Sequence, residues 1–298
     1  MSVDTGEKSM AIEANGLIQN LDHKFSFKNI AQIIKSGDNT CLEEIIVKGD
    51  LSDINEIDKN GRSYLSIAAE EGQFSCAKIL LDHGADLGNF VKNSDGVYKF
   101  NQYRNNAALY KACERGHYDI INLLSKHGAD SYHPYNPPLN ICAYKGDLKL
   151  AQLLIKYGAI VDNRVSDRSS VVHDATYSGN AELVEYLINN GGKSCIEPLD
   201  GRHTALLVAC RCENIDVIKV LLKHMIEKDE YTMKTSLLEA CYKNNTDMIR
   251  VVLEHGANKT EYDIYDIEDR SPFYIAYGNK DAIRLFLQHG VELNHRCP

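Results

Sequence analysis

Apolar residues in this chain gather in short blocks that recur at a nearly constant interval. Each block lies between a Gly, Asn or similar turn residue and a residue twelve positions later that is usually Gly, and its apolar positions have helical spacing. The clearest copies are Gly72–Gly84, Gly116–Gly128, Gly146–Gly158 and Gly179–Gly191; further copies begin at Glu213, Asn244 and Gly278, and a degenerate first copy spans Gly37–Gly49. Successive starts lie 35, 44, 30, 33, 34, 31 and 34 residues apart. The sequence therefore predicts a helical repeat of about 33 residues with one insertion.

A second, shorter helix is predicted upstream of each clear block. These helices are expected to begin at Ser63, Ala107, Pro137, Ser170, Thr204, Thr235 and, in a shortened form, Ser271. Most begin with a Ser or Thr cap or with Pro, as helix starts do. Small residues such as Ala68 and Ala69 recur in them where two helices must approach closely. Each repeat is therefore predicted to be a helical hairpin, and the Gly that closes the second helix is its left-handed C-cap.

This pattern resembles the ankyrin repeat, in which a helix starting Thr-Pro-Leu-His is followed by a Gly-His turn and a second helix that ends in Gly-Ala-Asp. The complete Thr-Pro-Leu-His string never occurs in this chain. The matching residues are Ser271-Pro272, Leu65, Leu139, His173, Gly116-His117, Gly84-Ala85-Asp86, Gly128-Ala129-Asp130 and Gly256-Ala257-Asn258. The resemblance implies an all-α helical-hairpin solenoid of about eight repeats, with short turn or β-hairpin fingers between them.

The chain is expected to divide into a polar N-terminal segment and one repeat array. The segment covers residues 1–27 and the array residues 28–298. The repeats are expected near residues 28–57, 58–86, 103–130, 133–161, 166–193, 200–226, 231–259 and 267–294, with an insertion at 87–102. A Gly-containing turn in the insertion predicts a hairpin, which is either a binding feature or tolerated decoration. The last repeat shows no polar cap, so we expect a partner or further chain over Phe286 and Leu287.

Composition and charge narrow the class of protein. Of 298 residues, 44% are hydrophobic and 25% charged, as in folded proteins, and the formal net charge of −9 argues against nucleic acid as a partner. The acidic N-terminus has no apolar run of signal-peptide length, and no stretch approaches the roughly 18 apolar residues of a membrane span. The nine cysteines are therefore expected to be free thiols. We expect a cytoplasmic protein without membrane insertion, with a nuclear location as the alternative.

The residues that could carry chemistry are better explained by the fold. His83, His127, His224, His255 and His289 recur at the end of the second helix, where His caps the last carbonyls, and repeats about 10 Å apart cannot bring such residues around one metal ion. Cysteines 113, 142, 210 and 241 fall at small core positions, whereas Cys212 is expected on the open face. No phosphate-binding glycine motif occurs. We therefore predict no catalytic residue, no metal, no cofactor and no small-molecule substrate.

A partner is expected on the concave face, where the first helices end and the preceding turns lie. Tyr and Arg are enriched where interfaces concentrate their energy, and this face is rich in both. The predicted partner-binding residues are Tyr103, Arg104, Arg115, His133, Tyr144, Lys145, Tyr177, Arg202, His203, Arg211, Tyr242, Lys243 and Tyr277. The hypothesis is a partner that is acidic or presents a terminal carboxylate along residues 133–277. The alternative is an ordinary solvated surface.

The function expected from this pattern is that of a non-catalytic adaptor or scaffold that binds another protein or peptide. Stacked repeats offer a long surface and no enclosed pocket, although this step from fold to function rests partly on analogy. The alternatives are the recognition domain of a larger enzyme, ubiquitin-ligase receptor or channel, and a pathogen effector that mimics a host adaptor. The sequence leaves the partner's identity, the pathway and the oligomeric state open.

Overall fold

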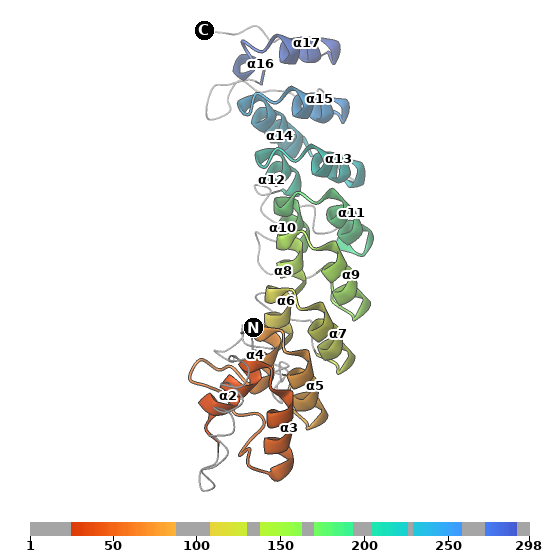
Figure 1. Ribbon diagram of the computed structural model, residues 1–298. Coiled ribbons are helices and arrows are strands. Elements are labelled where there is room, and N and C mark those ends of the chain that lie inside the picture. The colour runs from red at the N-terminus through yellow and green to blue at the C-terminus, as the bar shows by residue number, and fades with distance from the viewer. Residues whose placement is uncertain are drawn as a thin grey trace, which may run out of the picture. The chain divides into compact units, whose positions relative to one another are not determined.

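The computed structural model contains helical hairpins joined by loops (Figure 1). It describes residues 25–87, 108–129, 138–162, 170–192, 204–225, 229–257 and 272–290. The chain divides into two compact units, unit 1 over Met1–Leu124 and unit 2 over Ser125–Pro298. None of the helices in these ranges is long and apolar enough to cross a membrane.

Unit 1 consists of stacked helical hairpins. The pairs are α2 (Phe27–Ser36) with α3 (Asn39–Lys48), α4 (Tyr64–Glu71) with α5 (Phe74–Asp82), and α6 (Ala108–Arg115) with α7 (Tyr118–Lys126), the last of which runs across the unit boundary. Helix α4 packs against both α2 and α6, while α3 packs against α5. First and second helices therefore form separate layers.

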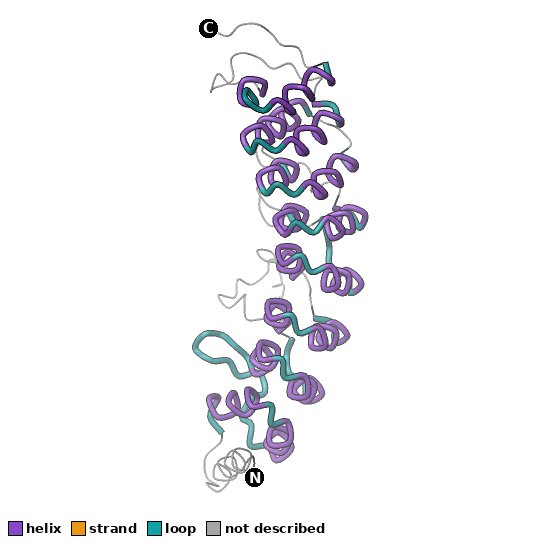
Figure 2. The backbone as a smooth tube through the Cα atoms, turned by 45° about the horizontal axis from the view of Figure 1, so that its top comes forward, coloured by secondary structure: helices purple, strands orange, loops and turns teal. Residues whose placement is uncertain are grey.

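Unit 2 continues the same plan. Its hairpins are α8 (Pro138–Lys145) with α9 (Leu148–Lys156), α10 (Val171–Ser178) with α11 (Ala181–Asn189), α12 (Ala205–Arg211) with α13 (Ile215–His224), α14 (Glu230–Tyr242) with α15 (Thr246–Glu254), and α16 (Pro272–Ile275) with α17 (Lys280–Gln288). The first helices pack in the order α8, α10, α12, α14, α16, and the second helices form a parallel row beside them (Figure 2). The helical-hairpin solenoid predicted from the sequence is confirmed.

The core lies between the two rows and between neighbouring first helices. Small residues make this possible: Cys142, Ala143, Ala209 and Cys210 are completely buried where first helices approach one another. Leucines of the second helices, such as Leu154, fill the space behind them. A single hairpin cannot enclose such an apolar face, so each repeat depends on its neighbours for burial.

The turn between the two helices of a hairpin contains a left-handed backbone position, which is usually Gly. Gly179 ends α10 with a φ of 75°, a left-handed conformation that costs Gly little. Glu213 and Asn244 adopt φ values of 57° and 53° at equivalent turns, which are uncommon for residues with a side chain. The residue directly after Gly179 caps the next helix: the Asn180 side chain accepts a hydrogen bond from the N–H of Leu183.

The residue that caps the second helix also joins neighbouring repeats. Asn180 Nδ2 donates to the carbonyl oxygen of Gly146, 2.9 Å away in the preceding repeat. Gln73 Nε2 makes the equivalent bond to the carbonyl oxygen of Lys35 over 3.1 Å in unit 1. These bonds satisfy carbonyl groups at the end of a first helix that have no partner within it. The register between repeats is therefore set partly by polar contacts.

The start of α14 differs from the prediction. The sequence indicated a helix beginning at Thr235, but α14 begins at Glu230. The reason is a stronger cap upstream, where the Asp229 side chain accepts a hydrogen bond from the N–H of Thr232, and no Gly or Pro interrupts residues 230–235. Thr235 lies inside the helix and donates its hydroxyl to the carbonyl oxygen of Tyr231. Lys234, which directly precedes the predicted start, is therefore helical.

The predicted fingers are visible at one place in the described ranges. An antiparallel bridge joins Ile57 to Ser63, and Asp58 organises the turn between them by accepting from the N–H groups of Asn60 and Arg62. The predicted insertion hairpin lies outside the described residues, which stop at residue 87 and resume at residue 108. Of the two apolar residues expected to need a cover in the last hairpin, Phe286 is fully buried and Leu287 is exposed. The expectation that Phe286 needs an external cover was wrong.

Candidate functional site

Exposed tyrosines mark the ends of the first helices in unit 2. We call Tyr144, Tyr177, Tyr242 and Tyr277 the tyrosine row; their exposed fractions are 68%, 55%, 48% and 80%. They belong to α8, α10, α14 and the turn after α16, helices that lie in one packed series with α12 between them. Helices α8 and α10 bury most of their residues and present their C-terminal ends to solvent, and α14 likewise ends in an exposed tyrosine. The exposure predicted for these residues is confirmed.

The hydroxyl groups of the tyrosine row make no hydrogen bond to any part of the chain that the structure describes. This contrasts with Tyr64, which is fully buried and donates its hydroxyl to Glu56 over 3.0 Å. Burial raises the pKa of the Tyr64 hydroxyl well above its usual range, and its hydrogen bond to Glu56 adds to this. Tyr64 therefore serves the core, whereas the tyrosine row has no evident role in folding.

Basic residues stand beside the tyrosine row, as predicted, but two of them face carboxylates. Arg211 Nε lies 3.9 Å from Glu239 Oε2, and Lys243 Nζ lies 3.9 Å from Glu213 Oε1. The third, Lys145, is exposed at the end of α8. Sequence reasoning missed the two acidic partners, which come from the neighbouring repeats. The surface around the tyrosine row is consequently less basic than the sequence indicated.

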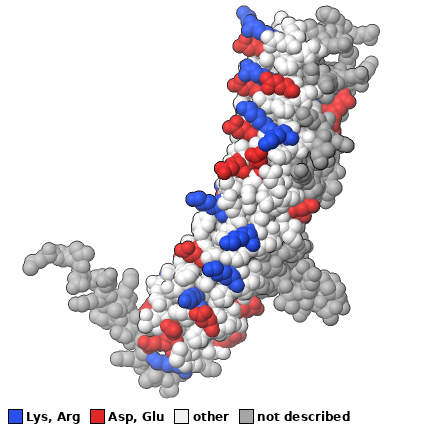
Figure 3. Space-filling model, turned by 90° about the vertical axis from the view of Figure 1, so that its right-hand side faces the viewer, with Lys and Arg blue, Asp and Glu red and all other residues white. Residues whose placement is uncertain are grey.

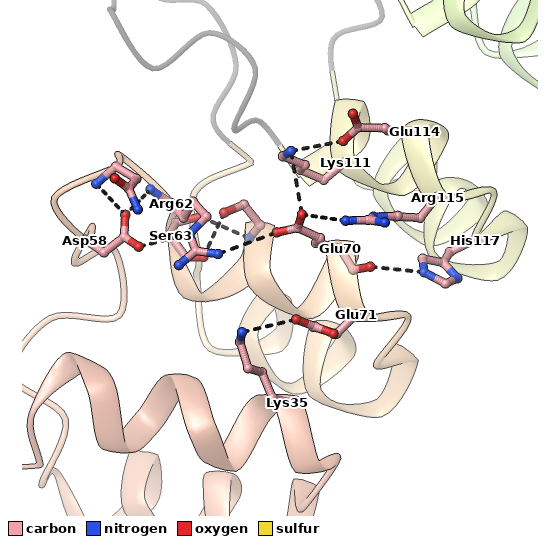
Figure 4. Close-up of polar contacts among 12 residues, drawn as sticks. Lys35, Asp58, Arg62, Ser63, Glu70, Glu71, Lys111, Glu114, Arg115 and His117 are labelled. Carbon is pink, nitrogen blue, oxygen red and sulfur yellow. Dashed lines mark hydrogen bonds and ion pairs between the residues drawn. The ribbon is translucent and has the colours of Figure 1, made fainter.

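In unit 1 the corresponding helix ends carry an ionic cluster instead of tyrosines (Figure 4). Glu70, at the end of α4, accepts a hydrogen bond from Arg115 Nη2 over 3.2 Å. Lys111 Nζ lies 3.7 Å and Arg62 Nη1 lies 3.8 Å from the same carboxylate. His117 Nε2 lies 3.2 Å from the Glu70 carbonyl oxygen. Arg115, one of the predicted partner-binding residues, therefore has an internal partner.

The charge of Glu70 is stabilised by this cluster. Partial burial by itself raises the pKa of the carboxyl group, but the hydrogen bond from Arg115 and the positive charges of Lys111, Arg115 and Arg62 lower it by more. The net result is a pKa below the usual value. Glu70 thus links α4 to α6 as an ionised group, a role that its place in the sequence did not reveal.

Several predicted site residues are not placed by the structure. Tyr103, Arg104, His133, Arg202 and His203 lie outside the described residues. They come from the turns between repeats, so the turn half of the predicted site stays a prediction. The helix-end half, from Tyr144 to Tyr277, lies within unit 2.

The histidine and cysteine predictions can be compared with the structure residue by residue. His255 Nδ1 and His289 Nδ1 lie 2.7 Å and 2.9 Å from the carbonyl oxygens of Val251 and Leu285, which confirms the capping role there. His224 instead faces Glu185, with Nε2 3.6 Å from Oε1. No group of three His, Cys, Asp or Glu side chains in the described ranges has an arrangement that could hold a metal ion.

The cysteines occupy the predicted environments. Cys113, Cys142, Cys210 and Cys241 are buried, whereas Cys212 is exposed. Burial raises the pKa of the Cys210 thiol to about 12, and the negative charge of Glu239 adds to this. The Cys210 thiol is therefore a poor nucleophile, and its place in the packed core accounts for it.

The second helices present a surface of a different kind. Acidic and basic side chains are interspersed on this face (Figure 3). Ion pairs recur at equivalent positions of successive helices, with Asp216–Lys219 at 3.7 Å, Asp247–Arg250 at 2.7 Å and Asp281–Arg284 at 3.4 Å. Exposed pairs three residues apart stabilise a helix only slightly. This face has the features of a solvated surface.

Comparison with known proteins identifies repeats in the same region. A family described as ankyrin repeats (three copies) matches residues 30–135 and 139–232. An ankyrin repeat protein of fowlpox virus is 29% identical over 170 residues, which cover 55% of this chain and 36% of the viral protein.

Two animal proteins show similar matches. The mouse B-cell lymphoma 3 protein homolog is 28% identical over 170 residues, covering 55% of this chain and 36% of its own length. A transient receptor potential cation channel subfamily A member 1 homolog of Caenorhabditis elegans is 25% identical over 198 residues. The match covers 57% of this chain and 16% of the channel homolog. The chain thus matches about a third or less of each of these longer relatives.

Proposed function

Because the chain belongs to the ankyrin-repeat family, whose repeats are generally protein–protein interaction modules, we propose that it is an adaptor or scaffold that captures a partner protein along the tyrosine row. The observation that carries this proposal is the recurrence of exposed tyrosines at the ends of successive first helices. Ankyrin repeats are typically non-catalytic, and a binding role needs no further chemistry in this chain.

The physical basis is the balance between apolar area and a polar end in each tyrosine. An exposed ring gains free energy when a partner removes it from water, and its hydroxyl group supplies a directional hydrogen bond. Tyr144 and Tyr277 are more than two-thirds exposed, so most of each side chain is available to a partner. Helix ends fixed by a packed core present these rings with little loss of entropy on binding.

The partner proposed here carries at least one carboxylate. Arg211 and Lys243 face Glu239 and Glu213 at 3.9 Å, and ion pairs of this exposure contribute about 0–1 kcal/mol. A partner carboxylate can therefore replace these contacts at small cost. The tighter cluster around Glu70 favours unit 2 over unit 1 as the site.

The test is capture of partners by the intact chain, followed by mass spectrometry. Replacing Tyr144, Arg211 and Tyr242 together with Ala is expected to abolish partner capture, because it removes two rings and the cation between them. The same change is expected to leave the melting temperature little altered, because all three side chains are exposed. The matched control is Tyr231→Ala in α14, a tyrosine that is 53% exposed and lies outside the row.

Two outcomes would contradict the proposal. Retention of every captured protein by the triple variant would show that binding does not use the tyrosine row. Loss of the same proteins in the Tyr231→Ala control would show that capture depends on general aromatic exposure. Higher salt is expected to weaken capture if the partner's carboxylate contributes.

A second candidate is that these repeats form the recognition part of a longer protein. The observation that favours it is that the relatives match over 16–36% of their own lengths. Reading the complete coding sequence decides this, because a catalytic or channel region in the same frame would support it. An open reading frame that encodes no more than the present chain would contradict this second candidate.

A further inference from the structure

The residues at the ends of α8, α10, α12 and α14 share one register, which Tyr277 does not, because it stands two residues before the N-cap Asn279 of α17. Each member stands three residues before the residue that caps the second helix: Tyr144 before Asp147, Tyr177 before Asn180, Arg211 before Asn214 and Tyr242 before Asn245. Their helices α8, α10, α12 and α14 pack against one another in that order. One side chain is therefore presented per repeat, in the order Tyr, Tyr, Arg, Tyr.

The distance between these side chains limits the conformation of an extended ligand. Packed helices lie about 8–10 Å apart, so successive members of the row are separated by about that distance. A polyproline II helix has three residues per turn and rises about 3.1 Å per residue, so one face returns every 9.3 Å or so. A β-strand presents the same face only about every 6.6 Å or 13 Å. Of these two conformations, polyproline II matches one contact per repeat.

An α-helical ligand matches the spacing but not the width of the surface. Positions seven residues apart on a helix are about 10.5 Å apart, yet a docked helix also buries positions three and four residues apart. That requires an apolar strip two side chains wide. Beside the tyrosines stand Lys145, Ser178, Cys212 and Lys243, none of them buried. Among these described helix-end residues the apolar strip is a single side chain wide, as a polyproline II ligand needs.

The hydrogen-bonding groups of the tyrosines and of a polyproline II ligand also match. The hydroxyls of Tyr144, Tyr177 and Tyr242 have no hydrogen-bond partner in the described part of the chain, and polyproline II leaves its backbone carbonyls unpaired. Proline rings pack on aromatic faces, and a preformed extended ligand loses little entropy on binding. The third of the four helix-end residues is Arg211, a half-exposed cation where the other three are tyrosines. A carboxylate in the ligand fits this place.

We propose that the helix-end residues from Tyr144 to Tyr242 bind a proline-rich segment in the polyproline II conformation, with prolines three residues apart and an acidic residue opposite Arg211. The expected pattern is Pro-x-x-Pro-x-x-Asp-x-x-Pro, read from Tyr144 to Tyr242, or its reverse, because polyproline II ligands are nearly symmetric along their axis. This inference rests on the proposed function of the same surface and names the chemistry of the partner.

The test measures binding of two synthetic peptides, one of each direction, to the intact chain by fluorescence anisotropy. At least one is expected to bind, and Tyr177→Ala is expected to weaken it at least about tenfold, as the loss of a central aromatic contact does. Tyr231→Ala, the matched exposed tyrosine outside the row, is expected to change the affinity less than about twofold. A peptide of the same composition with its prolines four residues apart is expected to bind at least about tenfold more weakly.

The contact with Arg211 is tested by a double-mutant cycle. Arg211→Ala in the protein and Asp→Ala in the peptide are each expected to weaken binding, and the two together are expected to cost less than their sum. Additive effects would overturn the assignment of the acidic residue to Arg211. Equal binding of the matched and four-residue-spaced peptides would overturn the polyproline II register.

The result also separates this inference from the proposed function. If neither peptide binds while the triple variant of Tyr144, Arg211 and Tyr242 still loses its captured partners, the row binds proteins but not polyproline II. If neither peptide binds and capture survives the triple change, both proposals are wrong. Circular dichroism of each variant confirms that a loss of binding is not a loss of folding.

Discussion

At the scale of single residues, the helix-end position acts differently in the two units. In α4 it is Glu70, which is surrounded by Arg62, Lys111 and Arg115. In α8 it is Tyr144, which is exposed and has no hydrogen-bond partner in the described ranges. The same place in the repeat therefore stabilises neighbouring helices in one unit and remains available to a partner in the other.

Glu70→Gln is expected to destabilise the chain by about 1–2 kcal/mol at pH 7, because three basic groups lose their shared carboxylate charge. The pKa of Glu70 is lowered in the folded state, so its contribution is complete above the usual Glu range. It is lost as the pH falls through the folded value. Urea unfolding of both proteins at pH 7 and near pH 3 measures this difference, which is expected to shrink in acid.

The control for this prediction is Glu44→Gln, which removes an exposed ion pair with Lys48 at 3.1 Å. Pairs of this kind contribute at most about 0.5 kcal/mol. A Glu70 effect no larger than the Glu44 effect, or one that persists unchanged in acid, would show that the cluster does not stabilise the fold.

At the scale of the helical element, one side chain both caps a helix and joins two repeats. Asn180 accepts from the N–H of Leu183 with Oδ1 and donates to the carbonyl oxygen of Gly146 with Nδ2. Asp147 and Asn245 cap α9 and α15 in the same way. The Asp147 carboxylate only caps, because it has no N–H to donate, whereas Asn245 also donates to Glu213 Oε2 of the preceding repeat over 3.2 Å.

Asn180→Ala is expected to cost about 1–2 kcal/mol, because it removes the cap and the bond between repeats. Asn180→Asp keeps the capping oxygen but cannot donate to Gly146, so its cost is expected to lie between those of wild type and Ala. Thermal and urea unfolding rank the three proteins. An Asp variant as unstable as the Ala variant would show that the inter-repeat bond dominates, and one equal to wild type would show that this bond contributes nothing.

Substitutions at two helix-ending glycines allow the cost of backbone strain to be measured apart from the cost of a steric clash. Gly49 and Gly72 share a φ of 76°, but a Cβ at Gly49 meets nothing within 4 Å, whereas a Cβ at Gly72 would lie 2.7 Å from His117 Cε1. Gly49→Ala is expected to cost about 1–2 kcal/mol for the left-handed backbone alone. Gly72→Ala is expected to cost about 1 kcal/mol more, because the ring must leave the Glu70 carbonyl oxygen.

A second variant checks the cause of this difference. In a His117→Ala background the ring is absent, so Gly72→Ala is expected to cost no more than Gly49→Ala. Urea unfolding of the single and double variants measures both values. A Gly72 penalty that survives removal of the ring would contradict the steric explanation.

At the scale of the whole molecule, the first and second helices expose different surfaces. The first helices of unit 2 end in the tyrosine row, and the second helices carry local ion pairs of mixed sign (Figure 3). A protein surface that serves only solubility needs charges of both signs and no repeated aromatic residues. The two surfaces therefore predict different responses to substitution.

Replacing Lys219, Arg250 and Arg284 together with Ala is expected to change stability by less than about 1 kcal/mol, because each belongs to an exposed pair with an Asp three residues earlier. Partner capture is expected to be unchanged. Affinity capture and urea unfolding of this variant beside the tyrosine-row variant measure both effects. Loss of partners here would place the binding surface on the second helices.

The hairpins themselves followed from the sequence because their causes are local. Apolar spacing, small residues such as Cys142 and turn glycines such as Gly179 act within a few positions of one another, and all appear where predicted. The start of α14 did not follow, because Thr235 offered a plausible cap and the competing Asp229 cap lies six residues upstream. Two reasonable caps in one segment cannot be ranked from the pattern alone.

The sequence by itself determined that this is an array of helical hairpins and that tyrosines stand exposed at the ends of its first helices. Only the tertiary structure decided which charges on that surface are already partnered. Arg115 meets Glu70 across 45 residues, and Arg211 meets Glu239 in the next repeat. Such contacts depend on how repeats stack and on side-chain directions, and no periodic pattern along one chain encodes them.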